Sequence, residues 1–307
     1  MIDQQLASTS DTLFWVTMVL YALGAGFLLH HFAFRGARAG TIGTVIAWSG
    51  AAVHLGSIVT RGLAAGRVPW GNMFEYSSVL ALLLVVGQLA YGDLRKGLRA
   101  MSGIALGVAL LWLALARATT YVPARELQVS LNSIWLKIHV FAAIAGTTMF
   151  LLSSIYSALF LVKLRSERRT LGSTVGAAHI DVFEEAGPET ATPPERRGFA
   201  SRLPAAARLD ELAHRTVQFA FPIWTFAVIA GAIWAHQAWG RYWGWDPKET
   251  WAFITWVVYA GYLHARATAG WRDKKAAILN VAAIGVVLFT YYGVNLWIPG
   301  LHSYANG

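Results

Sequence analysis

The sequence contains no cysteine. The chain therefore forms no disulfide of its own and supplies neither a thiol nucleophile nor the thiolates of an iron–sulfur cluster. Any thiol chemistry in which it takes part must use sulfur from another molecule. Charged residues are also scarce, at 13% of the chain, whereas about a quarter is usual in soluble domains. Together with a hydrophobic fraction of 56%, this composition predicts an integral membrane protein.

The net charge of +9 does not indicate a nucleic-acid partner. Lysine and arginine gather beside the apolar stretches, where membrane topology explains them, so we expect no nucleic-acid binding. The sequence also lacks a glycine-rich phosphate loop, a metalloprotease HExxH motif and a fixed-period repeat. The first apolar segment has no basic front end and no clear small-residue cleavage site, which predicts a retained membrane span rather than a signal peptide.

About eight apolar stretches are long enough, or nearly so, to cross a membrane. We therefore expect an all-α polytopic membrane protein. The stretches lie near residues 12–34, 41–60, 73–92, 100–117, 134–162, 215–236, 248–267 and 276–297. The fourth is the weakest candidate, because it is short and Arg117 follows it at once.

Basic residues follow the odd-numbered stretches more often than the even-numbered ones. The positive-inside rule then predicts that both termini and the loop at 236–250 face the outer side of the plasma (inner) membrane. Five membrane helices would occupy 1–165 and three more 213–307. Residues 166–212 are polar and without sustained apolar periodicity. They predict a largely disordered cytoplasmic linker, with a short amphipathic helix near 203–212 at most.

Residues 239–251 combine four tryptophans, a tyrosine and two glycines between two very apolar segments. Asp246 is a good N-cap, Pro247 suits the first helical position, and Glu249 completes a capping box, so a helix should begin at about Pro247. The glycines before it favour a loop. This loop carries Trp239, Trp243 and Trp245. It is either a membrane-interface belt or a surface for a large flat ligand.

Two of the nine histidines fall on the same predicted membrane face as this loop. His139 lies roughly 9 Å inside the outer end of the fifth stretch, at 1.5 Å per residue. His302 follows the eighth stretch. Two imidazoles and an aromatic surface are what a six-coordinate haem requires. Each histidine taken alone is more ordinary as a core or tail residue, so the hypothesis depends on their shared side.

His264 lies roughly 25 Å along the seventh helix from Pro247, near the inner edge of the membrane. It cannot bind the same iron as His139 and His302. It is either an interfacial histidine beside Arg266 or part of a second, deeper haem site. His54 could pair with it or simply be buried. The remaining histidines are predicted to be non-ligands: His30, His31, His179, His214 and His236.

The outward-facing segment 69–77 is also polar. Asn72 suits a helix cap. Glu75 either sits in the first turn of the third helix, where the helix dipole favours a carboxylate, or forms part of a pocket wall. The sequence leaves both explanations open.

The run Trp239-Gly-Arg-Tyr-Trp243-Gly-Trp245-Asp246-Pro-Lys-Glu249 resembles the tryptophan-rich WWD signature of the CcsA family of cytochrome c biogenesis proteins. That family is also called ResC, or CcsB in some actinobacterial naming. His139, His264 and His302 fall where its three histidines would. The resemblance extends from about residue 69 to the C-terminus.

The resemblance implies a membrane subunit of the System II cytochrome c synthase, or cytochrome c haem lyase. Its partners would be a CcsB/ResB-type membrane protein and apocytochrome c, and its cargo haem b. His139 and His302 would be axial ligands of the haem iron at an external site. His264 would belong to a second, transmembrane haem site, to which the partner supplies the other ligand.

The implied reaction joins two thiols of an apocytochrome CXXCH motif to the haem vinyl groups. Trp239, Trp243 and Trp245 would present the porphyrin, and Arg241 is a candidate partner for a propionate. Asp246 is either a helix cap or a haem contact. Two other functions stay open: a haem transporter or chaperone that serves a separate ligase, and a transporter of a non-haem solute.

Overall fold

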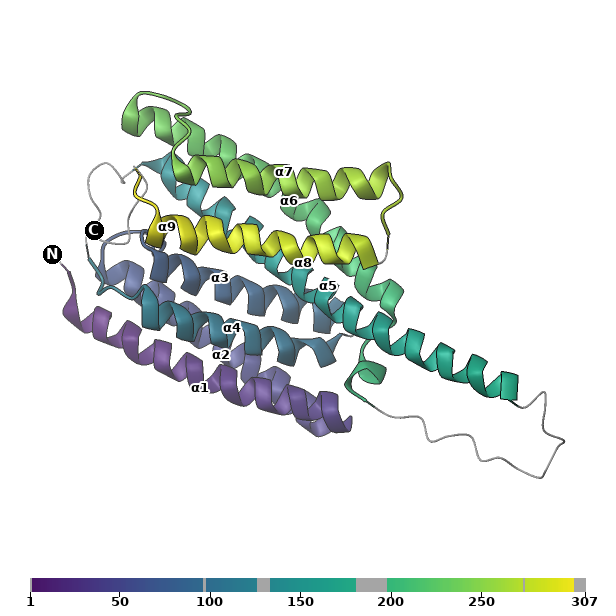
Figure 1. Ribbon diagram of the computed structural model, residues 1–307. Coiled ribbons are helices and arrows are strands. Elements are labelled where there is room, and N and C mark those ends of the chain that lie inside the picture. The colour runs from purple at the N-terminus through teal and green to yellow at the C-terminus, as the bar shows by residue number, and fades with distance from the viewer. Residues whose placement is uncertain (1, 96–97, 126–132, 181–197, 273, 301–307) are drawn as a thin grey trace.

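The computed structural model describes residues 2–95, 98–125, 133–180, 198–272 and 274–300. Every regular element within these ranges is a helix, as the sequence predicted. In the interior of a membrane, backbone N–H and C=O groups find no water, and a helix satisfies them within its own segment. The long helices accordingly run beside one another along one common direction (Figure 1).

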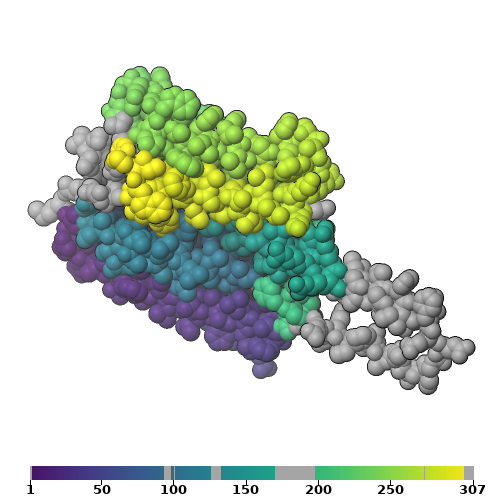
Figure 2. All heavy atoms as spheres, viewed as in Figure 1, coloured from purple at the N-terminus to yellow at the C-terminus, as the bar shows by residue number. Residues whose placement is uncertain are grey.

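The helices form two groups. The first contains α1 (Gln4–Phe34), α2 (Ala37–Ala64), α3 (Met73–Gly87) and α4 (Arg99–Thr119). The second contains α5 (Ile134–Ile180), α6 (Ala206–Trp239), α7 (Pro247–Ala267), α8 (Lys274–Leu288) and the short α9 (Val294–Trp297). Figures 1 and 2 show α1 on one side of the molecule and α6 and α7 on the other, with α3, α4 and α8 between them.

Two π-helical turns interrupt the otherwise regular spans. One, η1, covers Gln88–Arg95 after α3, and the other, η4, covers Phe289–Gly293 between α8 and α9. The second lies within the stretch 276–297 that the sequence predicted as a single span, and the first begins within the stretch 73–92 and extends beyond its end. A π turn contains an extra residue, so it changes the direction in which the following side chains point, and such turns are frequent at functional sites.

Seven helical segments of the described chain are long and apolar enough to cross a membrane. They include Met101–Thr119, the span that the sequence supported least. Helix α7 is not among them, although it has 21 residues. Its tryptophans, tyrosines, threonines and histidine lower its mean hydropathy, so seven of the eight stretches expected from the sequence qualify as spans by length and composition. Helix α7 nevertheless packs against α6 and α8 in the same bundle.

The start of α1, the loop between α6 and α7, and α9 lie at the same end of the bundle (Figure 1). The sequence predicted this shared end from its distribution of lysine and arginine. The side of the membrane that this end faces stays a prediction.

An exposed apolar stripe runs along α1. Trp15, Val19, Leu23 and Phe27 recur every four residues, which places them on one helix face, and they are between 38% and 58% exposed. On a soluble protein such a stripe would mark a binding or aggregation site. On a chain with this many spanning helices it is the surface expected to face lipid.

The predicted linker at 166–212 is more ordered than the sequence indicated. Helix α5 continues to Ile180 and α6 already begins at Ala206, so only 181–197 lie outside the described residues. Tertiary contacts explain the start of α6, because Leu209 and Leu212 are buried there. In addition, the Asp210 carboxylate accepts hydrogen bonds from both terminal nitrogens of Arg266 on α7, at 2.7 and 2.9 Å. The short amphipathic helix expected near 203–212 is thus the first part of α6, whose distant packing partners the sequence did not reveal.

Glycines allow α1 and α2 to approach closely. A Cβ atom built on Gly43 of α2 would lie 2.8 Å from Cγ and 3.0 Å from the backbone nitrogen of Leu28 on α1. Real Cβ atoms do not approach so closely, and the backbone nitrogen cannot move away alone. Packing this tight between helix backbones is typical of membrane bundles, where small residues sit at the interface.

We predict that Gly43→Ala destabilises the protein by about 1–3 kcal/mol, because α1 and α2 must separate to admit the methyl group. Gly26→Ala is the matched control, since nothing lies within 4 Å of a Cβ built there. Thermal unfolding in detergent should separate the two variants. Equal melting temperatures would show that this helix crossing is not tight.

Candidate functional site

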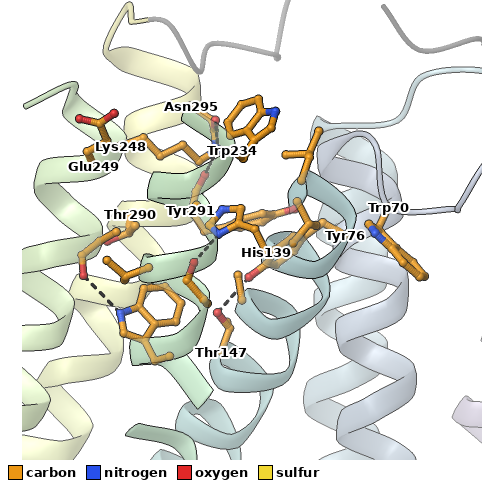
Figure 3. A pocket seen from close by; sticks show the side chains of 18 of the residues that line it. Trp70, Tyr76, His139, Thr147, Trp234, Lys248, Glu249, Thr290, Tyr291 and Asn295 are labelled. Atoms are coloured by element: carbon orange, nitrogen blue, oxygen red, sulfur yellow. Dashed lines mark hydrogen bonds between the residues drawn. The ribbon is translucent and has the colours of Figure 1, made fainter. Parts of the chain in front are cut away.

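A pocket opens among α3, α5, α6, α7 and α9, and its empty space is about 1260 Å³, including the part open to solvent. This is large enough for a sizeable organic ligand. Its walls come from segments far apart in the chain (Figure 3). The aromatic, polar and charged side chains that line it include Trp70, Asn72, Tyr76, His139, Thr147, Trp224, Trp234, Trp243, Lys248, Glu249, Thr290, Tyr291 and Asn295.

His139 borders the pocket from α5. Its Nδ1 lies 2.7 Å from the carbonyl oxygen of Ala227 on α6. A carbonyl only accepts, so Nδ1 carries the proton and Nε2 keeps its lone pair. Within the described residues no group hydrogen-bonds to Nε2. This is the arrangement by which a protein fixes the tautomer and ring orientation of a metal-binding histidine.

Gly231 provides the space for this imidazole. A Cβ built on Gly231 would lie 2.7 Å from Nδ1 and 2.8 Å from Cε1 of His139. Gly231 and Ala227 are four residues apart on α6, hence on one helix face. One face of α6 therefore both makes room for the ring and accepts the hydrogen bond from its Nδ1–H.

The tryptophan loop begins where α6 ends and is closed by the first turn of α7. Gly240 ends α6 with a φ of 73°, in the left-handed region that glycine adopts readily. Glu249 Oε2 accepts the N–H groups of Gly244 at 2.8 Å and Asp246 at 3.2 Å, while Asp246 Oδ1 accepts that of Lys248. The capping box and the helix start at Pro247, both predicted from the sequence, are confirmed.

Of the three loop tryptophans, Trp243 alone lines the described pocket, together with the neighbouring Tyr242. Trp239 packs edge-on against Trp234, with ring centroids 4.9 Å apart. Trp245 is 66% exposed and meets Trp243 edge-on at 5.7 Å. The loop tryptophans thus differ in their surroundings: Trp243 borders the cavity, whereas Trp245 lies on the surface.

Arg241 is exposed and lies over the loop backbone. A Cβ on Gly244 would be 2.1 Å from its guanidinium carbon, so the glycine makes room for this side chain. Neither Arg241 nor Asp246 is among the residues that line the pocket. Lys248, two positions beyond Asp246, does line it.

Two tyrosines that the sequence did not single out form a further wall. Tyr76 of α3 stacks on Tyr291 of η4, with centroids 4.5 Å apart and planes at 25°. The Tyr76 hydroxyl pairs with Thr147 Oγ1 at 2.9 Å, and that of Tyr291 donates to the carbonyl of Met73. The π turn contributes both Thr290 and Tyr291 to the lining. Polar residues within the otherwise apolar last span were the available sequence signal.

The segment before α3 is held by a buried ion cluster. Glu75 is 1% exposed and accepts the N–H of Gly71 at 2.8 Å. It also accepts hydrogen bonds from Nε of Arg61 at 3.0 Å and from the two terminal nitrogens of Arg67 at 2.6 and 3.0 Å. Glu75 is not a lining residue; it anchors the loop that presents Trp70 and Asn72 to the pocket.

The same arginines reach a second loop. Arg61 donates to the carbonyl of Val122 at 2.6 Å, and Arg67 to that of Arg125 at 3.0 Å. Asn72 caps α3 as predicted, its Oδ1 accepting the N–H of Glu75 at 2.9 Å. Of the two explanations that the sequence left open for Glu75, its position in the first turn of α3 therefore holds.

The other histidines whose side chains the structure describes do not line this pocket. His264 is exposed in the last turn of α7, at the opposite end of that helix from the tryptophan loop. His54 is fully buried, and its two ring nitrogens bond to Tyr21 at 3.1 Å and Ser78 at 2.9 Å, so neither is available to a metal. His236 stacks on Tyr242 at 4.3 Å.

His302 lies outside the described residues. The chain two positions before it is described, and Gly300 there lies beside the tryptophan loop. A Cβ built on Gly300 would be 2.8 Å from Oδ2 of Asp246 and 3.3 Å from Cδ of Pro247.

Comparison with known proteins identifies related sequences over most of the chain. A family model described as cytochrome C assembly protein matches residues 70–302. The cytochrome c biogenesis protein CcsA of Trichormus variabilis is 34% identical, covering 99% of this chain and 97% of that protein. The protein of the same name from Synechococcus elongatus is 37% identical, covering 86% of each.

A solved structure shares the fold. It is described as cytochrome c heme lyase CcmF and superposes with a TM-score of 0.63 at 16% sequence identity. The match covers 93% of this chain but 46% of that one, so this chain spans just under half of its length. At this level of identity the likeness concerns the arrangement of helices.

We predict that Glu75→Gln destabilises the protein by about 3–5 kcal/mol, because it leaves two buried guanidinium groups without a carboxylate. The control is Glu167→Gln, which removes a partly exposed pair with Lys163 at 3.8 Å and should cost less than about 1 kcal/mol. Thermal unfolding of the purified variants measures both. A Glu75→Gln protein as stable as the control variant would refute the anchoring role of the cluster.

Proposed function

From the premise that this chain belongs to the cytochrome c assembly family, as a CcsA-type cytochrome c biogenesis protein, we propose that its pocket binds haem for attachment to apocytochrome c. The observation that carries the proposal is the state of His139. Its Nδ1 donates to Ala227, which directs the lone pair of Nε2 toward a ligand. A neutral imidazole held in this way is the usual axial ligand of haem iron.

His302 is proposed as the second axial ligand. Its support is the position of Gly300, two residues earlier, against Asp246 at the base of the tryptophan loop. Two imidazoles would leave the iron six-coordinate, and the histidine of an arriving CXXCH motif would replace one of them.

The aromatic walls suit a flat, largely apolar molecule. Trp243 and Trp70 border the cavity, and the stacked pair of Tyr76 and Tyr291 closes another side. Aromatic rings offer large contact area with little loss of conformational entropy, which suits the faces of a porphyrin. We propose haem b as the cargo.

The proposed reaction is an addition without net oxidation or reduction. Each cysteine S–H of the apocytochrome adds across one vinyl C=C bond: sulfur bonds to the carbon next to the ring, and hydrogen goes to the terminal carbon. Both sulfurs come from the apocytochrome, since this chain has no cysteine. The contribution of this chain is to hold the haem in one orientation, which lowers the entropic part of the barrier.

The synthase also requires a partner in this proposal. His264 is exposed near the opposite end of α7, and the described chain holds no group of three or more histidine and acidic side chains placed to bind a metal ion. A ResB-type membrane protein docking on this face would supply the second ligand of a deeper haem site. Haem would then pass toward the pocket, whose end of the bundle we place on the extracytoplasmic side of the plasma membrane.

We predict that His139→Ala lowers the haem that co-purifies with the complex about tenfold or more and abolishes its low-spin spectrum, because the iron loses a positioned ligand. Absorption spectra and a covalent-haem stain of a co-expressed apocytochrome provide the measurement. His30→Ala, an exposed histidine at the other end of the bundle, is the control.

Gly231→Ala tests the same site sterically and leaves every histidine in place. Its methyl group should displace the imidazole and weaken haem binding, whereas Gly261→Ala, with nothing within 4 Å, should not. If the His139→Ala variant has the same absorption spectrum as the wild type and still supports cytochrome maturation, the proposal is wrong. If the wild-type complex binds haem but never attaches it to the co-expressed apocytochrome, the result would favour a haem carrier that serves a separate ligase.

For His264→Ala we predict loss of one haem species from the complex with the ResB-type partner while the species that depends on His139 persists. The reason is that His264 and His139 are too far apart to share an iron. Resonance Raman spectra of the complex should resolve the two species. An unchanged spectrum would assign His264 a structural role.

A further inference from the structure

Two hydrogen-bond donors in the pocket wall have no partner among the described residues. They are Nε1 of Trp70 and Nδ2 of Asn72, and both atoms are buried. The two residues line the pocket from the loop before α3, with Gly71 between them. An indole nitrogen and an amide nitrogen only donate, and a buried donor without a partner costs free energy. This wall of the pocket therefore fits an acceptor group on the ligand.

The loop is held in place without the use of these two donors. Asn72 caps α3 through Oδ1, which accepts the N–H of Glu75 and leaves Nδ2 for another contact. The Glu75 carboxylate in turn accepts the backbone N–H of Gly71. The Trp70 ring lies against Phe141 of α5, with ring centroids 5.7 Å apart. Both donors are thus positioned before a ligand arrives, which lowers the entropic cost of binding.

The ion cluster beneath this loop carries a net positive charge. It joins the two guanidinium groups of Arg61 and Arg67 to the single carboxylate of Glu75, so two positive charges meet one negative charge. The N-terminus of α3, which Asn72 caps, adds a partial positive charge at the same place. An anionic acceptor therefore suits this wall better than a neutral one, and N–H groups bind a carboxylate more strongly than an uncharged oxygen.

The opposite wall is less suited to a carboxylate. Nζ of Lys248 already donates to Oδ1 of Asn295, and the Asp246 carboxylate acts on this ammonium group electrostatically. The Glu249 carboxylate also lines the pocket and would repel an anion. In Figure 3, Lys248 and Glu249 lie on one side of His139 and Trp70 lies on the other. A carboxylate on the ligand is therefore favoured on the Trp70 side.

We propose that Trp70 and Asn72 together bind one carboxylate of the pocket ligand, which for haem is a propionate. This rests on the proposed function of the pocket. Propionates and vinyl groups occupy opposite edges of haem b, so a carboxylate held at Trp70 turns the vinyl edge across His139 toward the side of Lys248. The two donors thereby determine which edge of the porphyrin is presented for attachment, a role that the sequence had suggested for the exposed Arg241.

Haem b and its dimethyl ester, which lacks the carboxylate charges, test this inference. Each compound is titrated into the purified full-length protein in lipid nanodiscs, and the Soret band reports both its affinity and the ligation of its iron. The quantity compared between wild type and variants is the ratio of the haem affinity to the ester affinity. Partition of either compound into lipid then cancels.

Asn72→Asp should lower this ratio about tenfold or more, because the new carboxylate oxygen keeps the helix cap but replaces a donor and repels a propionate. Asn72→Ser, which also caps a helix but adds no charge, should lower the ratio less. Trp70→Phe keeps an aromatic ring without the N–H and should lower the ratio about tenfold. The low-spin spectrum should persist in all three variants, since His139 is unchanged.

Trp112→Phe is the matched control for the indole. Nε1 of Trp112 is likewise buried without a partner among the described residues, but Trp112 does not line the pocket, so this variant should keep the wild-type ratio. Lys248→Met and Arg241→Met should keep it as well. A tenfold fall in the ratio in either of these two variants would place the carboxylate there and overturn the inference.

A wild-type ratio in Trp70→Phe overturns the inference, even if Asn72→Asp fails to fold, and would mean that water satisfies the donors. A wild-type ratio in folded Asn72→Asp overturns it as well. A wild-type protein that binds neither compound refutes the proposed function instead, and the inference with it.

Discussion

The pocket depends on two buried glutamates, each at the third position of a helix, that accept N–H groups from the loop before it. The Glu249 carboxylate accepts hydrogen bonds from the backbone N–H groups of Gly244 and Asp246, which precede α7. The Glu75 carboxylate accepts one from the backbone N–H of Gly71, which precedes α3. Backbone that is neither helical nor hydrated is costly in a membrane protein. The carboxylates remove that cost and so allow irregular, aromatic-rich loops to form opposite walls of one cavity.

The histidines show how the surroundings divide one residue type into different roles. His54 uses both ring nitrogens within the first group of helices, which leaves it structural. His139 uses one ring nitrogen, Nδ1, in a hydrogen bond to the Ala227 carbonyl on α6, and Gly231 leaves space for the ring. The difference lies entirely in the neighbouring helix, because both histidines are found in apolar spans of similar composition.

The pocket also links the two groups of helices. The family match begins at residue 70, yet the loop that starts there is held by Arg61 and Arg67, which precede it. Helix α2 therefore contributes to the site without lining it. On the far side, the π turn after α8 provides Tyr291, which stacks on Tyr76 and orients the amide beside Lys248. A ligand in the pocket would contact both groups at once.

The sequence by itself determined the features that follow from local chemistry. These are the helical spans, from apolar runs, and the start of α7, from Asp246, Pro247 and Glu249. Tertiary structure alone decided which side chains meet. It placed Trp243 at the cavity and Trp245 on the surface, paired Glu75 with Arg61 and Arg67, and brought Lys248 to Asn295, 47 residues away. Helix periodicity records only which residues share a face, whereas the facing partner depends on how distant helices pack.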